Sequence, residues 1–247
     1  MIRRRITQHI KDQNWTAIGI DFVIVVAGVF LGIQLGNWNQ QASLDREKAR
    51  YLQQLSTDFQ VAEDTLEDQI ADYRQYLAAT RKALDIKRSK ARVTEEEALD
   101  AFLTFGSGRI PPGSPPTLQE LISSGKVDLI DDFELRNELM QTHAKFETMA
   151  RIFDLVRIRA NRVQTPIYAH IEYNSDVEIS PKQLGDPTRS RKANSIDIAG
   201  LRADPEVETA LEIFLNSHRN MLELELSALE QVSQLNEMLA AEIEEGS

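Results

Sequence analysis

Asp21 is the one acidic residue inside the longest apolar run of the chain. A carboxylate in such an apolar setting can have a chemical role. Between Ala17 and Leu35 only Asp21 and Gln34 are strongly polar. A carboxylate inside a bilayer costs roughly 3 kcal/mol at the centre and less near the edge. Asp21 therefore has three interpretations: it reaches the lipid headgroups or a local partner such as Lys11, it contacts a second helix, or it carries protons or ions.

Three glycines, Gly28, Gly32 and Gly36, recur every four residues in the same run. Small residues at this spacing let membrane helices approach closely. At 100° per residue, Gly28 and Gly32 lie within about 20° of Asp21. We expect this face to pack against a second copy or another membrane protein, with Gln34 as a polar contact on nearly the opposite side. The alternative is that glycine is simply common in membrane helices.

No other part of the chain offers a catalytic or metal-binding pattern. The sequence has no cysteine, and none of its four histidines has another histidine at metal-ligand spacing. It contains no HExxH, phosphate-loop or dinucleotide-binding motif. Carboxylate pairs such as Asp131 and Asp132 are explained by helix capping and the helix dipole. We therefore expect no enzymatic activity, no cofactor and no metal site.

The element that would position Asp21 and the glycines is a helix long enough to cross a bilayer. The run from Ala17 to Leu35 spans about 28 Å as a helix, close to one hydrocarbon core. Trp15 and Trp38 flank it as membrane-interface anchors do. We predict a transmembrane helix over residues 15–38. A cleaved signal peptide is the alternative, but the run exceeds a usual signal core and no small-x-small pair ends it.

Charge predicts the orientation and the location of the remaining chain. The basic cluster Arg3, Arg4 and Arg5 in the short head 1–14 favours a cytoplasmic N-terminus. Residues 39–247 then lie in the periplasm of a bacterial cell, below a single-pass anchor in the inner membrane. Residues 1–38 carry four basic and two acidic residues, so the rest has a net charge of −13. Such an acidic surface repels nucleic acid, and the lipid bilayer is the expected partner.

Residues 39–247 have the pattern of an all-α domain. Apolar residues at alternating steps of three and four predict a long helix to about residue 90, continuing the membrane helix. Capping signals predict helix starts after Thr94, Asp131 and Asp204. Proline and glycine predict irregular loops at about 106–116 and 174–203. Three long and two short helices therefore predict one elongated helical bundle.

Two stretches resemble the signatures of a widespread bacterial family of uncharacterised single-pass membrane proteins. The first spans residues 18–39, with a Val/Ile-rich core and a Gln-x-x-Asn-Trp-Asn exit at Gln34, Asn37, Trp38 and Asn39. The second is residues 118–130, LQELISSGKVDLI, followed by Glu134-Leu-Arg136. The resemblance implies a membrane-anchored helical protein. Because the family carries a domain of unknown function, it implies no activity and no catalytic residues.

The leading functional prediction is a non-enzymatic membrane protein whose periplasmic domain is an interaction or scaffold module, self-associating or bound to another membrane protein. One alternative is an accessory subunit of an ion-driven envelope machine, with Asp21 titrating. Another is a periplasmic ligand sensor that acts through a partner membrane protein, because a head of about fourteen residues is too small for an output domain.

Overall fold

The computed structural model describes residues 15–106, 108–173 and 193–246, with side chains from residue 20 onward. Within these residues the chain forms seven α-helices, one 3₁₀ helix and a two-stranded antiparallel sheet. The coarse prediction of a helical protein is confirmed, and the small sheet was not expected. The chain divides into two compact units, Met1–Arg50 and Tyr51–Ser247, which are described separately.

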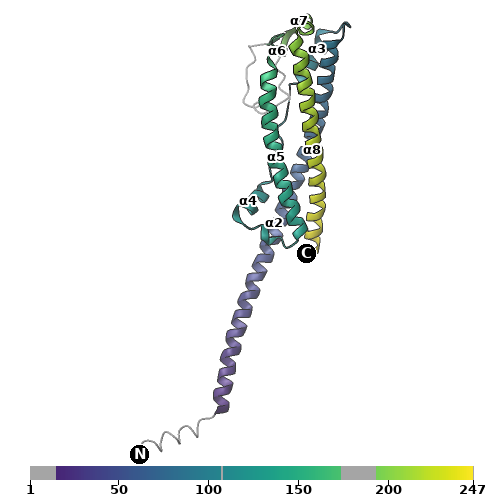
Figure 1. Ribbon diagram of the computed structural model, residues 1–247. Coiled ribbons are helices and arrows are strands. Elements are labelled where there is room, and N and C mark those ends of the chain that lie inside the picture. The colour runs from purple at the N-terminus through teal and green to yellow at the C-terminus, as the bar shows by residue number, and fades with distance from the viewer. Residues whose placement is uncertain (1–14, 107, 174–192, 247) are drawn as a thin grey trace, which may run out of the picture. The chain divides into compact units, whose positions relative to one another are not determined.

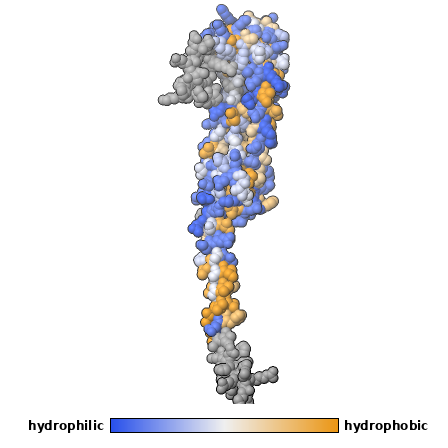
Figure 2. Space-filling view, turned by 90° about the vertical axis from the view of Figure 1, so that its left-hand side faces the viewer, coloured by the Kyte–Doolittle hydropathy of each residue, from blue (hydrophilic) through white to orange (hydrophobic). Residues whose placement is uncertain are grey.

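The first unit contains the beginning of helix α2 (Trp15–Arg88). Eleven large apolar side chains between Ile20 and Leu35 are exposed, none of them by less than 49%. Figure 2 shows that the surface along this part of the helix is largely orange, which marks hydrophobic residues. The helix includes an 18-residue stretch apolar enough to cross a membrane, and none of it is buried within the described chain. The prediction of one long apolar N-terminal helix is therefore confirmed.

The second unit contains the remainder of α2 and two further long helices, α5 (Phe133–Val163) and α8 (Pro205–Glu245). These helices run side by side, as Figure 1 shows. The predicted apolar seam of α2 is buried at every position: Leu52, Leu55, Phe59, Ala62, Leu66, Ile70, Tyr73, Leu77 and Leu84. The step of three and four residues keeps these side chains on one helix face, where they pack against α5 and α8.

The short elements begin and end at recognisable capping residues. Helix α3 (Glu95–Thr104) has the predicted capping box, in which Thr94 accepts from the backbone N–H of Glu97 and the Glu97 carboxylate accepts from that of Thr94. Helix α4 (Pro116–Ser124) ends at Gly125, whose φ of 69° is left-handed. A side chain disfavours this conformation, so glycine suits the position.

Part of the structure differs from the sequence prediction. Part of the stretch 174–203 is regular: strand β2 (Ala193–Ile196) pairs with β1 (Ile171–Tyr173), and helix α7 (Ile198–Ala203) follows. Burial of Ile196 and Leu201 in an apolar cluster stabilises this segment. Residues 127–129 form the 3₁₀ helix η1 (Val127–Leu129).

Helix α5 is capped by a residue other than the predicted one. Its N-cap is Asp132 rather than Asp131, because the Asp132 carboxylate accepts from the N–H groups of Glu134 and Leu135. It stops at Val163, and the separate helix α6 (Thr165–Tyr168) follows with proline in its first turn. Proline lacks the N–H that a continuous helix would need there.

Two apolar clusters make up most of the core of the second unit. The first joins α2, α4, α5 and the C-terminal half of α8. The second joins the end of α2 with α3, α6, α7, the sheet and the start of α8. Between them lies a smaller cluster around Tyr73, Tyr76 and Met221. Polar side chains are buried at this intermediate level, and they form the candidate site.

Candidate functional site

Glu225 on α8 is the most unusual residue of the second unit. Its side chain is fully buried, and neither carboxylate oxygen has a hydrogen-bond partner in the described part of the chain. Burial raises the pKa of Glu225 to about 8; the nearby Arg109 opposes this rise and Asp72 adds to it. A buried charge without a partner is costly, so this carboxyl group holds its proton near neutral pH.

Two tyrosines of α2 and a histidine of α8 surround this level of the fold. The rings of Tyr73 and Tyr76 meet edge to face, with centroids 5.5 Å apart. His218 lies 6.1 Å and 5.7 Å from these two rings, and its Nδ1 is 3.2 Å from the hydroxyl of Thr80. Burial raises the pKa of Tyr73, and the charge of Glu225 raises it further. Tyr73, Tyr76 and His218 are thus buried together between α2 and α8.

Three polar contacts join the loop after α3 to the part of α2 around Tyr73. Arg109 forms an ion pair with Asp72 at 2.9 Å. The Tyr73 hydroxyl donates to the carbonyl of Arg109 at 3.2 Å, and the amide of Gln69 donates to the carbonyl of Ile110 at 2.8 Å. The guanidinium is thus engaged by Asp72 and does not donate to the buried carboxylate of α8.

A pocket of about 160 Å³ lies beside this cluster, lined by residues of α2, α5 and α8. Its wall includes the aromatic side chains Tyr73, Phe153 and Phe214, together with Met221 and His218. A dry apolar cavity of roughly 150 Å³ holds one benzene-sized molecule. The pocket is therefore large enough for a small ligand.

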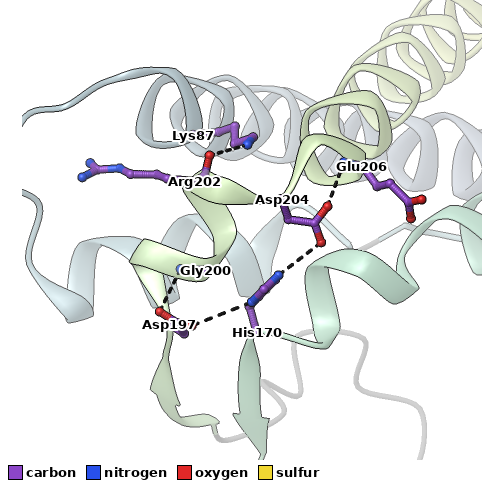
Figure 3. A network of polar contacts seen from close by, with 7 residues as sticks. All are labelled: Lys87, His170, Asp197, Gly200, Arg202, Asp204 and Glu206. Atoms are coloured by element: carbon purple, nitrogen blue, oxygen red, sulfur yellow. Dashed lines mark hydrogen bonds and ion pairs between the residues drawn. The ribbon is translucent and has the colours of Figure 1, made fainter.

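A second polar network lies where α8 begins, and Figure 3 shows it. His170 stands between two carboxylates, with Nε2 3.3 Å from Asp204 and Nδ1 4.0 Å from Asp197. Asp204 caps α8 by accepting from the N–H of Glu206, and this bond, with the contact to His170, lowers the pKa of Asp204. Asp197 caps α7 by accepting from the N–H of Gly200. Helix capping explains the positions of both carboxylates, so this network stabilises the starts of α7 and α8.

A larger pocket of about 680 Å³ adjoins that network and is lined in part by Arg162, Asp204 and Glu206. Among its described lining residues, none has a buried side-chain polar atom without a partner. The smaller pocket, whose wall includes Tyr73 and His218 of the buried polar cluster, is therefore the candidate site.

The residues predicted from the sequence lie elsewhere. Asp21, Gln34 and Trp38 are exposed on the first unit. A Cβ added at Gly28, Gly32 or Gly36 would meet nothing within 4 Å, so the glycine face is open in this chain. Its packing against a partner stays a prediction. The side chain of Trp15 and the cluster of Arg3, Arg4 and Arg5 lie outside the described residues.

The sequence prediction missed Glu225 and His218, although their spacing carried a signal. Both lie on the buried seam of α8, which runs through His218, Met221, Glu225, Ala228, Val232, Leu235 and Leu239. A charged residue at such a position is forced inside by helix geometry. A search for polar residues on the apolar seam would have found them.

No family model, curated protein or solved structure matches the chain. The resemblance to the single-pass membrane family therefore stays a prediction. In the part of the chain that the structure describes, no group of three or more histidine, cysteine, aspartate or glutamate side chains is arranged to hold a metal ion.

Proposed function

We propose that this protein is a single-pass inner-membrane protein whose periplasmic helical bundle serves as an interaction or scaffold module. The observation that carries the proposal is the exposed apolar run of the first unit. Burying one large apolar side chain is worth about 1.5–3 kcal/mol. Eleven such side chains are exposed between Ile20 and Leu35, so covering them is worth on the order of 20 kcal/mol. A bilayer supplies this cover along the length of one helix.

The interaction role rests on surfaces that the chain leaves open. Leu155 and Ile158 lie three residues apart on α5, and they are 68% and 46% exposed. Residues at this spacing share a helix face. In the membrane segment, Gly28, Gly32 and Gly36 leave open space for a close helix partner. The proposed partner is a second copy of the chain or another membrane protein.

Membrane extraction tests the anchor. The full chain is expressed in a Gram-negative host and washed with alkaline carbonate, and we expect it to stay in the membrane pellet at its full mass. The double variant Val26→Arg/Phe30→Arg should move to the soluble fraction, because charges in the bilayer are costly. Val61→Arg is the matched control, since Val61 is an exposed apolar residue of the same helix in the second unit. Carbonate extraction of the unmodified chain, or loss of its N-terminal segment, would refute the anchor.

The mass of the native complex in mild detergent tests the partner. Gly32→Leu should dissociate a complex that forms through the glycine face, whereas Val23→Leu, on the opposite side of the helix, should leave it intact. Co-purification of a multi-span protein that Asp21→Asn releases would instead favour the ion-driven machine. A strictly monomeric chain that captures no membrane protein would contradict the scaffold role.

A further inference from the structure

The outward face of α5 carries a stripe of two apolar residues between two basic ones, made up of Arg151, Leu155, Ile158 and Arg162. From this stripe we propose that α5 docks an acidic amphipathic helix of another protein, whose carboxylates pair with the two arginines. The inference rests on the interaction role proposed above, and it names the chemistry of the partner.

The four residues of the stripe share one helix face because of their spacing. They follow one another at steps of four, three and four residues, which at 100° per residue places them within about 60° of one another. The stripe lies opposite Phe146 and Met149, which are buried in the first apolar cluster. Leu155 and Ile158 are 68% and 46% exposed, and both arginines are exposed as well. The stripe is therefore open to a partner over a length of about 17 Å.

The charge of this part of α5 is opposite to that of the domain around it. Residues 39–247 have a net charge of −13, whereas residues 151–162 contain four arginines and one aspartate. The aspartate, Asp154, pairs with Arg157 at 3.1 Å, and both of these residues lie beside the stripe. The stripe itself thus presents positive charge on an acidic domain.

The arginines at the two ends of the stripe have no carboxylate partner in the described part of the chain. Arg151 donates to the hydroxyl of Thr148 at 3.0 Å. Within the same described residues, Arg162 makes no hydrogen bond or ion pair, and neither does Arg159, which lies next to the stripe. An arginine presents N–H donors that match a carboxylate in a two-bond contact. The stripe therefore fits a helix that carries two carboxylates on one face, about three turns apart.

A second copy of the same stripe would be a poor partner. The spacing is the same in both directions, so parallel pairing places each arginine against its counterpart, and antiparallel pairing places Arg151 against Arg162. Like charges that meet across an interface are unfavourable. An anionic lipid surface is also unfavourable, because the acidic domain as a whole repels it. An acidic helix that covers only the stripe contacts both apolar residues and neutralises both arginines.

The stripe ends at a recess that extends the docking surface. Arg162 lines the pocket of about 680 Å³ together with Ala210 and Ile213 of α8. Asp204 and Glu206 line this pocket as well, so its wall favours an apolar side chain of the partner over a carboxylate. Two exposed apolar residues on the helix and a recess at its end supply the anchors that a helix-to-helix contact needs.

Site-specific photo-crosslinking in the native membrane tests the proposal. Benzoylphenylalanine replaces Leu155 in the full chain, and the adduct is mapped to a peptide by mass spectrometry. We expect a helical segment of another protein with two carboxylates on one face. Arg151→Glu/Arg162→Glu should lower the adduct yield by about tenfold or more, because like charges then meet. Arg151→Lys/Arg162→Lys should retain most of it. Arg74→Glu/Arg81→Glu is the matched control, because it changes the net charge equally at exposed arginines of α2.

Charge exchange then tests whether the arginines contact the mapped segment. Replacing its two carboxylates with lysine should lower the adduct yield with the unmodified chain and restore it with Arg151→Glu/Arg162→Glu. No adduct at Leu155, an adduct with a second copy, or a yield that is the same in Arg151→Glu/Arg162→Glu would each overturn the proposal. Flotation with phosphatidylglycerol vesicles that depends on both arginines would overturn it as well, because the stripe would then bind lipid.

The same crosslinker at Val25 separates this inference from the interaction role on which it rests. Val25 lies on the face of Gly28 and Gly32 in the membrane segment. An adduct at Val25 without one at Leu155 would leave the interaction role intact and overturn only the docking surface on α5. Adducts at neither position, together with a strictly monomeric mass, would contradict both.

Discussion

Replacing Glu225 with glutamine should change the pH dependence of stability more than any other single substitution in the second unit. The two side chains have nearly the same shape, but the amide cannot ionise. The pKa of Glu225 in the folded protein is about 8, against an ordinary value of 4.5. The folded state therefore binds the proton more tightly than the unfolded state, and stability is lost as the pH rises from 4.5 toward 8.

The size of the effect follows from the two pKa values. A tenfold difference in proton affinity corresponds to about 1.4 kcal/mol. Ionisation of Glu225 should therefore destabilise the fold by roughly 3 kcal/mol at pH 7 and roughly 5 kcal/mol at pH 9. At pH 5 the effect is about 1 kcal/mol. Glu225→Gln should thus resemble the unmodified protein at pH 5 and exceed it in stability at pH 9.

Thermal unfolding followed by circular dichroism at 222 nm measures this difference on the full chain in detergent. For a domain of about 200 residues, 1 kcal/mol shifts the midpoint by roughly 2–4 °C. The midpoint of Glu225→Gln should therefore lie roughly 10–20 °C above that of the unmodified protein at pH 9. Glu223→Gln should follow the unmodified protein at every pH, because Glu223 is exposed.

A parallel pH dependence of the unmodified protein and Glu225→Gln would refute the reasoning. It would mean that the Glu225 carboxylate is hydrated or paired in solution. A variant less stable than the unmodified protein at both pH values would refute it as well, because the carboxylate would then make a favourable contact that glutamine cannot replace.

Three further substitutions test local features, each through the midpoint of urea unfolding of the full chain. Gly125→Ala should lower the free energy of unfolding by about 1 kcal/mol. The φ angle is 69° there, which a side chain disfavours although an added Cβ would meet no neighbour. Gly113→Ala, with equally open space, should change the free energy of unfolding little. Thr94→Ala should cost about 1 kcal/mol through loss of the capping box, and an unchanged midpoint would show that the cap contributes nothing. Gly200→Ala should lower the free energy of unfolding by about 1–3 kcal/mol, because its Cβ would collide with the Asp197 carboxylate and lie 2.6 Å from Nδ1 of His170; a smaller loss would mean that these two side chains move aside.

Much of the helical architecture was predictable from the sequence because its signals are local. The apolar run before Trp38, the capping box at Thr94 and the turn at Gly125 each depend on a few neighbouring residues. The buried seam of α2 was also predictable, since helix geometry places every third or fourth residue on the same face. The sheet between β1 and β2 was not, because it depends on pairing between segments that are distant in the sequence.

The candidate site depends on contacts between residues far apart in the chain. Thr80 meets His218 across 138 residues, and Gln69 meets Ile110 across 41. The spacing on α8 places Glu225 inside, but it does not show whether a partner neutralises the charge. Whether the charge is neutralised depends on which side chains of α2, α5 and the loop after α3 lie next to Glu225 in the folded chain. Because Arg109 pairs with Asp72 there, the carboxylate of Glu225 has no hydrogen-bond partner among the residues that the structure describes.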